Sequence, residues 1–447
     1  MALSAFLERL GDVPISRDPA EIRRKSKDYF WFSPVLAEEL QHLEAEVIVT
    51  PRDRADLLRV AAASAASGVP LTARGGGTGN YGQCVPLAGG AVVDLTGLAR
   101  IRRLEAGAVE VEAGIAMFDL ETRLRAEGQE LRMFPTTWHT ATLGGFVAGG
   151  TGGVGSVHWG GLREPGNLLA AEVITVEETP RVLTLKGQQC NLVNRTFGTT
   201  GLISALTIPT RAAVDWQDML VTFAELADAI AFGQALCRAQ GVEKRLVSLS
   251  CGALAGYFRP FAGQIPAGHA VVAVMVAPAG CLAVEELAAA HRGAVALQRA
   301  NAAAEADPDS LPIYEIAFNH ATQHVLRRAR GYTYLQSLCP SAEVLLALRA
   351  RLGDEVMWHV EFIGFDGGHA MNTLPVLRWG GRQRLAEVIA LFEAEGAPVA
   401  NPHVVTVEDG SRYKRLPGDQ LGFKQAVDPA GLLNPGKMRS FKRADAA

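Results

Sequence analysis

The sequence predicts an α+β protein that begins with a β-α-β unit and continues in antiparallel sheets covered by helices. Three observations lead to this fold class. A strand, a helix and a second strand follow one another between residues 47 and 73, short strands separated by turns continue to residue 208, and Ala- and Leu-rich amphipathic helices alternate with strands beyond about residue 212. With 447 residues, 48% apolar and 20% charged, we expect two or three domains rather than one core.

The β-α-β unit starts with the apolar residues 47–49. Thr50 is expected to cap the following helix, with Pro51 at its first position and Gly68 at its end. A second strand then covers 69–73. The loop after the second strand of such a unit is a natural ligand site, and residues 74–83 contain five glycines that allow the backbone to approach a ligand closely.

Strand and helix patterns continue along both halves of the chain. Strands are predicted at 91–95, 109–113, 171–176, 182–185 and 202–208, with a helix at 117–127 closed by Gly128. Pro209 is expected to end the first half. The second half is predicted to hold strands at 220–223, 269–277, 356–362 and 398–407, with helices on one face of an antiparallel sheet. Residues 423–437 indicate a short helix broken by Pro and Gly.

Charge and cysteine content exclude several partner classes. The net charge is −4 and Lys and Arg are scattered, so neither a nucleic acid nor an anionic membrane surface is expected as a partner. No apolar run has the length of a membrane span or a signal peptide, so we expect a cytoplasmic protein. The six cysteines lack a CxxC pair and regular spacing, which predicts reduced, mostly buried thiols.

Two glycine-rich stretches, 77–82 and 150–155, both match GxGxxG. A nicotinamide-dinucleotide site needs a long helix directly after such a loop, but Pro and Gly residues follow both stretches, which argues against that reading. Both are instead expected to be extended loops whose N–H groups form a nest for a diphosphate. For either loop alone, a flexible surface turn is an equally good interpretation.

Together the two stretches resemble a known family. Residues 74–79 look like the first phosphate-binding segment of the FAD-binding domain of the vanillyl-alcohol-oxidase/PCMH superfamily, and Pro135 with residues 141–150 looks like the second. Residues 197–203 are similar to the strand entry that meets the adenine end. Asp428-Pro429 and residues 433–437 resemble the C-terminal signature.

The resemblance implies a two-subdomain PCMH-type FAD-binding domain with an α+β cap. It divides the chain into an N-terminal helical segment (1–40), the FAD domain (41–211), a substrate-side cap (212–418) and a tail (419–447) that returns to the FAD domain. It also implies that the FAD contacts are Arg74, Gly75, Gly76, Gly77, Thr78, Gly79, Asn80, Gln83, Pro135, Thr136, Thr140, Ala141, Thr142, Leu143, Gly144, Gly145, Ala148, Gly149, Gly152, Gly155, Ser156, Gly201, Ile203, Asn434 and Lys437.

The resemblance further predicts that FAD is held non-covalently. Thr78 stands where some members carry the histidine that attaches to the flavin, and no cysteine lies between Cys84 and Cys190 to form a second link. Arg74 is expected to orient the first loop.

Candidate catalytic residues come from polar positions on predicted cap strands. His403 and His359 are the preferred bases, with Tyr334 as a phenol and Arg378 as a cation for a carboxylate. His359 and Glu361 are expected on one face of their strand. For each residue taken alone, a structural role is the more common one.

Other aromatic and basic residues flank the second glycine stretch: Trp138, His139, His158, Trp159 and Arg163. They are expected either near the flavin ring or in the packing of the domain. His320 and His324 have the i, i+4 spacing of a zinc pair but lack the glutamate of a metalloprotease, so no metal is expected.

These inferences predict an FAD-dependent oxidoreductase that oxidises a small hydroxy acid or other alcohol by hydride transfer to flavin N5. An NAD(P)H-linked flavin reductase on the same fold and a flavin-binding protein without turnover are the alternatives, and a nicotinamide-dependent dehydrogenase is a further rival. The expected partners are a small-molecule substrate and an unidentified electron acceptor, and a homodimer is left open.

Overall fold

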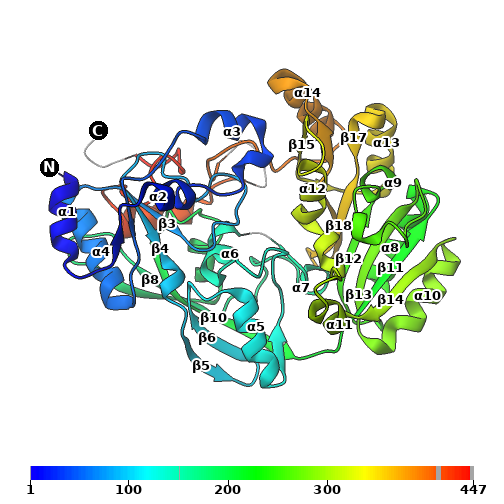
Figure 1. Cartoon of the computed structure of the whole chain (residues 1–447), viewed down its shortest axis with the longest axis horizontal. Helices are drawn as coiled ribbons and strands as arrows, with labels where there is room; N and C mark the ends of the chain where they lie inside the picture. Colours follow the sequence, from blue (N-terminus) through cyan, green and yellow to red (C-terminus); the bar gives the residue numbers. More distant parts are fainter. Residues whose placement is uncertain (1, 151, 409–413, 443–447) are drawn as a thin grey trace.

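The computed structural model describes residues 2–150, 152–408 and 414–442. Two lobes lie side by side, and both chain ends lie in the same lobe (Figure 1). Thr151, in the second GxGxxG stretch, lies outside the described residues.

The first lobe contains the elements up to β10 together with the C-terminal helix. These are α1 (Ala2–Leu10), β1 (Ile15–Ser16), α2 (Pro19–Lys25), η1 (Phe30–Phe32), α3 (Pro34–Leu40), β2 (Val47–Val49), α4 (Arg54–Ser67), β3 (Leu71–Arg74), β4 (Ala91–Asp94), η2 (Leu95–Gly97), β5 (Ile101–Glu105), β6 (Ala108–Glu112), α5 (Met117–Ala126), β7 (Gln129–Leu131), α6 (Leu143–Gly149), α7 (Ser156–Trp159), β8 (Ala170–Ile174), β9 (Val182–Lys186), η3 (Gly187–Leu192), β10 (Leu202–Ala212) and α15 (Gly418–Val427).

The second lobe contains the elements from β11 to α14. These are β11 (Gln217–Phe223), α8 (Leu226–Arg238), β12 (Lys244–Ser250), α9 (Gly252–Ala255), η4 (Arg259–Phe261), β13 (Ala270–Val276), η5 (Pro278–Gly280), α10 (Cys281–Ala290), β14 (Ala294–Ala300), α11 (Asn301–Ala306), η6 (Ile313–Ile316), α12 (Phe318–Leu326), β15 (Tyr332–Tyr334), β16 (Ser337–Cys339), α13 (Ala342–Leu352), η7 (Gly353–Glu355), β17 (Val356–Met357), β18 (His359–Phe365), β19 (Gly368–Thr373), β20 (Val376–Arg378) and α14 (Gly381–Ala394).

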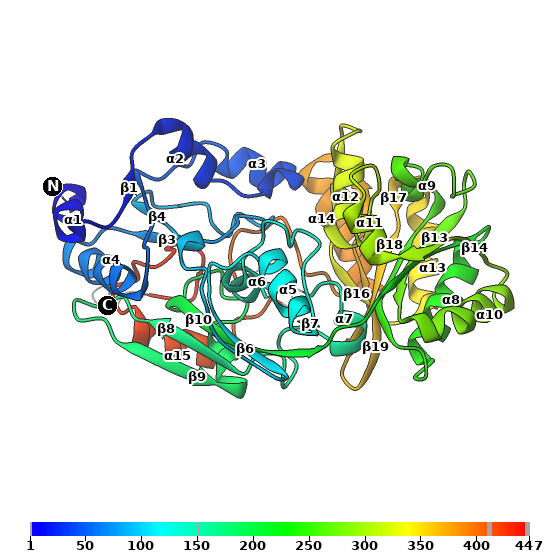
Figure 2. The ribbon, with the colours of Figure 1, turned by 60° about the horizontal axis from the view of Figure 1, so that its bottom comes forward.

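Two sheets form the first lobe. In the smaller sheet, of order β1-β2-β4-β3, β4 runs parallel to both β2 and β3, as the predicted β-α-β unit requires. The larger sheet has the order β5-β6-β10-β8-β9, with β7 paired to β10, and is antiparallel. Figure 2 shows α15 along β8 and β9, while α5 and α6 lie over the other side of that sheet. Helix α6, which carries glycines of the second glycine-rich segment, therefore lies between the two sheets.

The second lobe is built on an antiparallel sheet of order β14-β11-β13-β12-β18-β19-β16. The apolar strands β12 and β13 are buried along their whole length, which explains their hydrophobic composition. Helices α8, α10 and α13 pack together on one face of this sheet, and α7, η6 and α12 meet the other. The predicted α+β class is confirmed.

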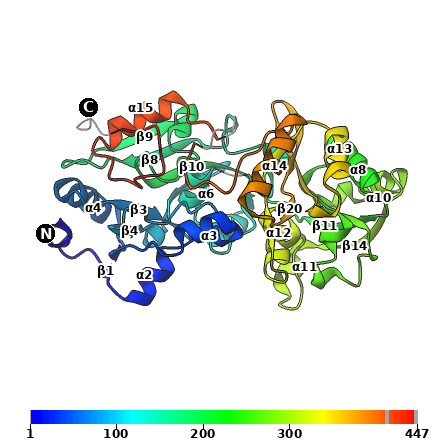
Figure 3. The same cartoon turned by 90° about the horizontal axis from the view of Figure 1, so that it is seen from above.

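The two lobes also meet through side chains. Seen from above, α3 of the first lobe reaches toward the second lobe near α14 (Figure 3). Arg382 of α14 forms ion pairs with Glu38 and Glu39 of α3, both at 2.9 Å.

Four element predictions differ from the structure. The helix α4 begins after Asp53 rather than Thr50, because the Asp53 side chain accepts the Asp56 N–H at 2.9 Å. Pro209 lies inside β10 instead of ending it. The pairing of β10 with β8 stops at residue 207 and its pairing with β7 begins at residue 210, so the proline occupies the gap between these two partners.

The third wrong prediction concerns residues 398–407. They form one bridge, from Val399 to Ser337, and then a loop that returns to the first lobe, where the Val407 N–H donates to the Lys437 carbonyl. The predicted strand 356–362 is also divided, because the chain passes from the three-stranded sheet of β17 to the seven-stranded sheet of β18 at Trp358.

None of the helices in the described part of the chain combines the length and the apolar character needed to cross a bilayer.

Candidate functional site

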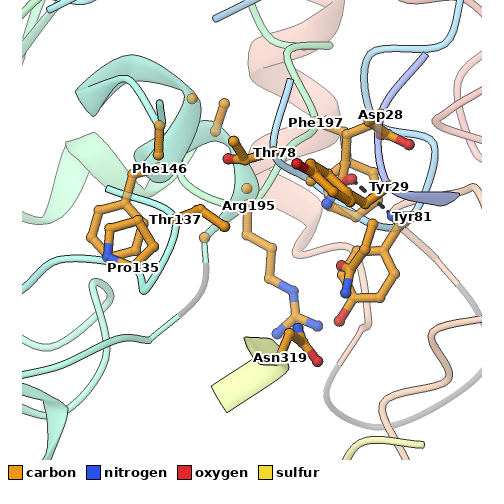
Figure 4. A pocket seen from close by; sticks show the side chains of 18 of the residues that line it. Asp28, Tyr29, Thr78, Tyr81, Pro135, Thr137, Phe146, Arg195, Phe197 and Asn319 are labelled. Atoms are coloured by element: carbon orange, nitrogen blue, oxygen red, sulfur yellow. Dashed lines mark hydrogen bonds between the residues drawn. The ribbon is translucent and has the colours of Figure 1, made fainter. Parts of the chain in front are cut away.

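A deep cleft lies where the glycine-rich segments face the second lobe (Figure 4). Its empty volume is about 2260 Å³ including open solvent. The first-lobe wall is backbone-rich and carries the two glycine segments. The second-lobe wall comes from α12, β16, β18 and β19.

The first glycine loop packs tightly against the second segment. A Cβ added at Gly75 would lie 2.0 Å from Thr142 Oγ1, and one at Gly76 would lie 2.0 Å from the Thr140 carbonyl oxygen. Glycine is therefore required at both positions, because the first loop touches the Thr142 side chain at Gly75 and the Thr140 backbone at Gly76. Within the described part of the chain, the N–H groups of residues 76–80 have no protein acceptor. This run of free donors at the cleft suits a bound anion.

A short helix, which the sequence did not predict, precedes the second GxGxxG stretch. Residues 143–149 form the short helix α6, which Thr142 caps by accepting the Gly145 N–H at 3.2 Å. Gly150 ends the helix with φ +63°, a left-handed conformation that favours glycine. The helix could not be recognised from Gly145, Gly149 and Gly150, because glycine disfavours helix interiors.

Arg74 joins the start of the first loop to the N-terminal segment. Its Nη1 donates to the carbonyls of Lys25 and Lys27 at 3.0 and 2.7 Å and lies 3.1 Å from Cys84 Sγ. Burial raises the pKa of the Cys84 thiol to about 11, so this thiol is protonated at neutral pH. All six cysteines are buried and unpaired with one another.

The two predicted C-terminal contacts lie behind the loops rather than at the cleft. The Asn434 Nδ2 donates to the carbonyls of Gln83 and Phe197, at 2.8 and 2.5 Å, and so ties together two cleft loops. Lys437 is fully buried and its Nζ donates to the Gly82 carbonyl. Both residues position the loops, because burial removes them from contact with a ligand.

Most of the residues proposed to contact FAD line the cleft. Those that do are Arg74, Gly75, Gly76, Gly77, Thr78, Gly79, Asn80, Gln83, Pro135, Thr136, Ala141, Thr142, Gly144, Gly145, Ala148, Gly149, Gly152, Ser156, Gly201 and Ile203. Those that do not are Thr140, Leu143, Gly155, Asn434 and Lys437. Leu143 packs in the core, and the N–H of Gly155 donates to the Arg245 carbonyl.

His403, a preferred base, does not line the cleft. It is 5% exposed, with Nδ1 2.7 Å from Ser33 Oγ and Nε2 2.9 Å from the Tyr334 carbonyl oxygen. Burial lowers the pKa of His403 to about 4. Nε2–H must donate to the carbonyl, which leaves Nδ1 to accept from the serine hydroxyl. With both ring nitrogens engaged, His403 joins the returning loop to the first lobe.

The other three catalytic candidates also lie away from the cleft lining. His359 is fully buried, with Nδ1 2.9 Å from Ser250 Oγ and Nε2 2.8 Å from Glu361 Oε1. Tyr334 is fully buried against Phe32, and burial raises the pKa of its phenol. Arg378 is exposed on the outer three-stranded sheet. Strand alternation predicted which faces these residues share but not which face meets the cleft.

The residues flanking the second glycine stretch do not line the cleft either. Trp138 stacks on Phe134 in the core at 4.0 Å between ring centroids, and His158 packs edge-on against Trp159. The packing interpretation therefore describes them better than contact with a ligand.

Helix α12 supplies three of the polar residues of the opposite wall: Asn319, His320 and Gln323. His320 Nδ1 lies 2.6 Å from Glu315 Oε2, and the His320 side chain is 14% exposed. A carboxylate accepts only, so Nδ1 carries the proton and Nε2 keeps a lone pair. This arrangement gives a proton acceptor whose orientation is set by a carboxylate. The described residues contain no group of three or more His, Cys, Asp or Glu side chains able to hold a metal ion.

One sequence feature belongs to this wall: His320 and His324 have the i, i+4 spacing of a zinc pair. That spacing predicted neither a base nor contact with the cleft. No sequence pattern indicated Arg195, which lines the cleft from the loop before β10. Nor did the sequence assign the aromatic residues Tyr29 and Phe32 of the N-terminal segment, which also line the cleft.

Comparison with known proteins agrees with this geometry. Residues 45–184 match the family described as FAD binding domain. A D-2-hydroxyglutarate dehydrogenase of Escherichia coli (strain K12) is 31% identical over 174 residues, which is 36% of this chain and 17% of that protein. An uncharacterised FAD-linked oxidoreductase of Mycobacterium tuberculosis (strain ATCC 25618 / H37Rv) is 28% identical over 127 residues, 28% of this chain and 26% of the relative. The match thus spans about a quarter of that relative's length.

The fold as a whole matches solved structures of an alkyldihydroxyacetonephosphate synthase. The TM-score is 0.73 at 14% sequence identity, and the match covers 96% of this chain and 85% of the other. At this identity the likeness shows the fold alone. Because that neighbour is a synthase, the fold does not determine the reaction.

The fold and the cleft define an FAD-binding protein in which a second lobe faces the cofactor site. Residues 45–184 are thus an FAD-binding domain, and its features are similar to those of the PCMH-type FAD-binding superfamily. The residues present fit the cofactor: the N–H groups of residues 76–80 can hold its diphosphate, and the cleft extends from this loop to α12.

Proposed function

We propose that the protein is an FAD-dependent oxidoreductase that oxidises a small hydroxy acid or other alcohol and passes the electrons to a separate acceptor. The observation that carries this proposal is His320, a histidine oriented by Glu315 on the wall opposite the FAD-binding loops. The names of the relatives, FAD-linked oxidoreductase and D-2-hydroxyglutarate dehydrogenase, support the same class of reaction.

In this proposal the first-lobe wall holds the cofactor and the second-lobe wall supplies the base. Bound FAD supplies the hydride acceptor. His320 Nε2 takes the proton of the substrate hydroxyl, and Glu315 stabilises the resulting imidazolium through Nδ1–H. Phe318 and Phe365, which line the cleft from the second lobe, exclude water from the reacting carbon.

We also propose that FAD is bound without a covalent link. Thr78 has no group that forms such a bond, and Cys84, the cysteine that lines the cleft, is protonated at neutral pH because burial raises its pKa to about 11.

The test is the visible spectrum of the purified protein, followed by anaerobic addition of hydroxy acids and alcohols. We expect a flavin spectrum that at least one member of the panel bleaches. Rapid bleaching by NADPH alone would favour a reductase, and a flavin that no donor reduces would favour a binding protein without turnover. Absence of bound flavin, with no binding of added FAD, would overturn the assignment of the cleft.

A further inference from the structure

One cation in the cleft has no role in the proposal so far. Arg195 lies in the loop between η3 and β10, and its side chain points across the cleft toward Asn319 of α12 (Figure 4). Within the described residues, its guanidinium has no carboxylate within 4.0 Å and donates no hydrogen bond to protein. A guanidinium has five N–H donors, so an unpaired one facing a cleft is suited to an anionic ligand.

The backbone around Arg195 is built to hold this side chain in the cleft. Arg195 has φ +58°, a left-handed conformation that a non-glycine residue rarely adopts. Its N–H donates to the Val147 carbonyl at 3.1 Å, near the end of α6. A Cβ at Gly150 would lie 2.0 Å from Arg195 Cβ, so the glycine leaves the space that Arg195 occupies. The second glycine segment thus also positions a cation.

The surroundings of Arg195 favour an anion. Burial, and then repulsion from Arg195, lowers the pKa of Arg163, which donates to the Asn194 carbonyl at 3.1 Å. On the opposite wall, Asn319 lines the cleft with a side-chain amide whose NH2 group can donate to an anion. The carboxylate of Glu315 is engaged by His320. Arg195 therefore faces the cleft with no carboxylate within 4.0 Å among the described residues, although Asp28 lines another part of the same cleft.

We propose that Arg195 binds a carboxylate of the substrate, with Asn319 as a second polar contact, so that the substrate is a hydroxy acid rather than a neutral alcohol. This inference rests on the proposed function, because it names the substrate class of the same site. Asn319 and His320 both line the cleft from α12, so a carboxylate held between Arg195 and Asn319 places a 2-hydroxy acid in the same cleft as the base. The diphosphate of FAD is the other anion that Arg195 can reach, and the test separates the two sources.

The test measures binding without turnover. The FAD-loaded protein is titrated with oxalate, which has no C–H bond to oxidise, and with its neutral diamide oxamide, while the flavin absorbance is followed. The variants are Arg195→Met and Arg195→Lys, with Arg163→Met as the matched control that removes a neighbouring cation outside the cleft lining. The affinity of each apoprotein for FAD is measured separately.

We expect oxalate, and not oxamide, to perturb the flavin spectrum. Arg195→Met should weaken oxalate binding on the order of tenfold to a hundredfold, and Arg195→Lys should weaken it less. Arg163→Met should weaken oxalate binding by less than about threefold. The affinity for FAD should stay nearly constant in all three variants. Three results would overturn the inference: no response to oxalate, equal oxalate affinity in Arg195→Met, or a loss of FAD affinity alone, which would assign Arg195 to the diphosphate. Failure of the proposed function has a different signature, since it appears as a flavin that no substrate reduces.

Discussion

The replacement Glu315→Gln tests the proposed base most directly. Glu315 Oε2 lies 2.6 Å from His320 Nδ1, and the two side chains are 22% and 14% exposed. Glutamine keeps the size and one acceptor but removes the charge that stabilises the imidazolium. A hydrogen bond to a charged group contributes about 1.5–3 kcal/mol and a neutral one about 1 kcal/mol, so the expected loss is about 1–2 kcal/mol. This corresponds to a rate decrease of roughly fivefold to thirtyfold.

The assay is anaerobic flavin reduction followed by stopped-flow absorbance over a range of substrate concentrations. Glu315 does not line the cleft, so we expect the limiting rate to fall while the substrate dissociation constant stays within about twofold. Glu315→Asp keeps the charge and should recover part of the rate. His320→Asn removes the base itself and should slow reduction by on the order of 10²–10⁴.

His324→Gln is the matched control for this series. His324 lies on the same helix one turn further on, outside the lining of the main cleft, and its Nε2 contacts the Glu315 carbonyl oxygen at 3.1 Å, a contact that glutamine can keep. We expect reduction within about twofold of the native rate. The reasoning is refuted if Glu315→Gln leaves the limiting rate unchanged, or if His324→Gln lowers it equally.

Three further predictions concern the cofactor cradle and stability. Gly76→Ala places a Cβ against the Thr140 carbonyl, so unfolding free energy should fall by about 1–3 kcal/mol and FAD should bind more weakly. Gly422→Ala, in open space within α15, should lower neither in melting and titration experiments. Burial lowers the pKa of His403 from 6.5 to about 4, so its stabilising effect is complete above pH 6.5 and is lost as pH falls toward 4. The melting temperature of His403→Gln should therefore fall less between pH 7.5 and pH 5 than that of the native protein; an equal fall contradicts this role. Denaturation should release all flavin into the supernatant, and flavin retained in the precipitate would contradict non-covalent binding.

Local patterns predicted the fold class and much of the cofactor cradle. The β-α-β unit, the glycine loop after its second strand and the alternating strands of both lobes depend on residues close together in sequence. The N-cap of α4 and the helix α6 were missed because the choice depends on single competing hydrogen bonds, such as Asp53 to Asp56, or on glycines that disfavour a helix until packing stabilises it.

The polar residues of the second lobe show what the sequence could not decide. His359 and His403 have the composition of a catalytic base, yet both are buried with their ring nitrogens next to protein atoms. His320 meets the cleft because α12 lies across from loops more than 150 residues earlier in the chain.

The sequence by itself determined which segments have the backbone freedom to hold a diphosphate, because that ability depends on closely spaced glycines. Only the tertiary structure decided which side chains face the bound ligand. Arg195 and His320 come from different lobes, and their meeting in one cleft depends on how the two lobes pack. No pattern within either segment records that packing, since it arises from contacts between residues distant in sequence.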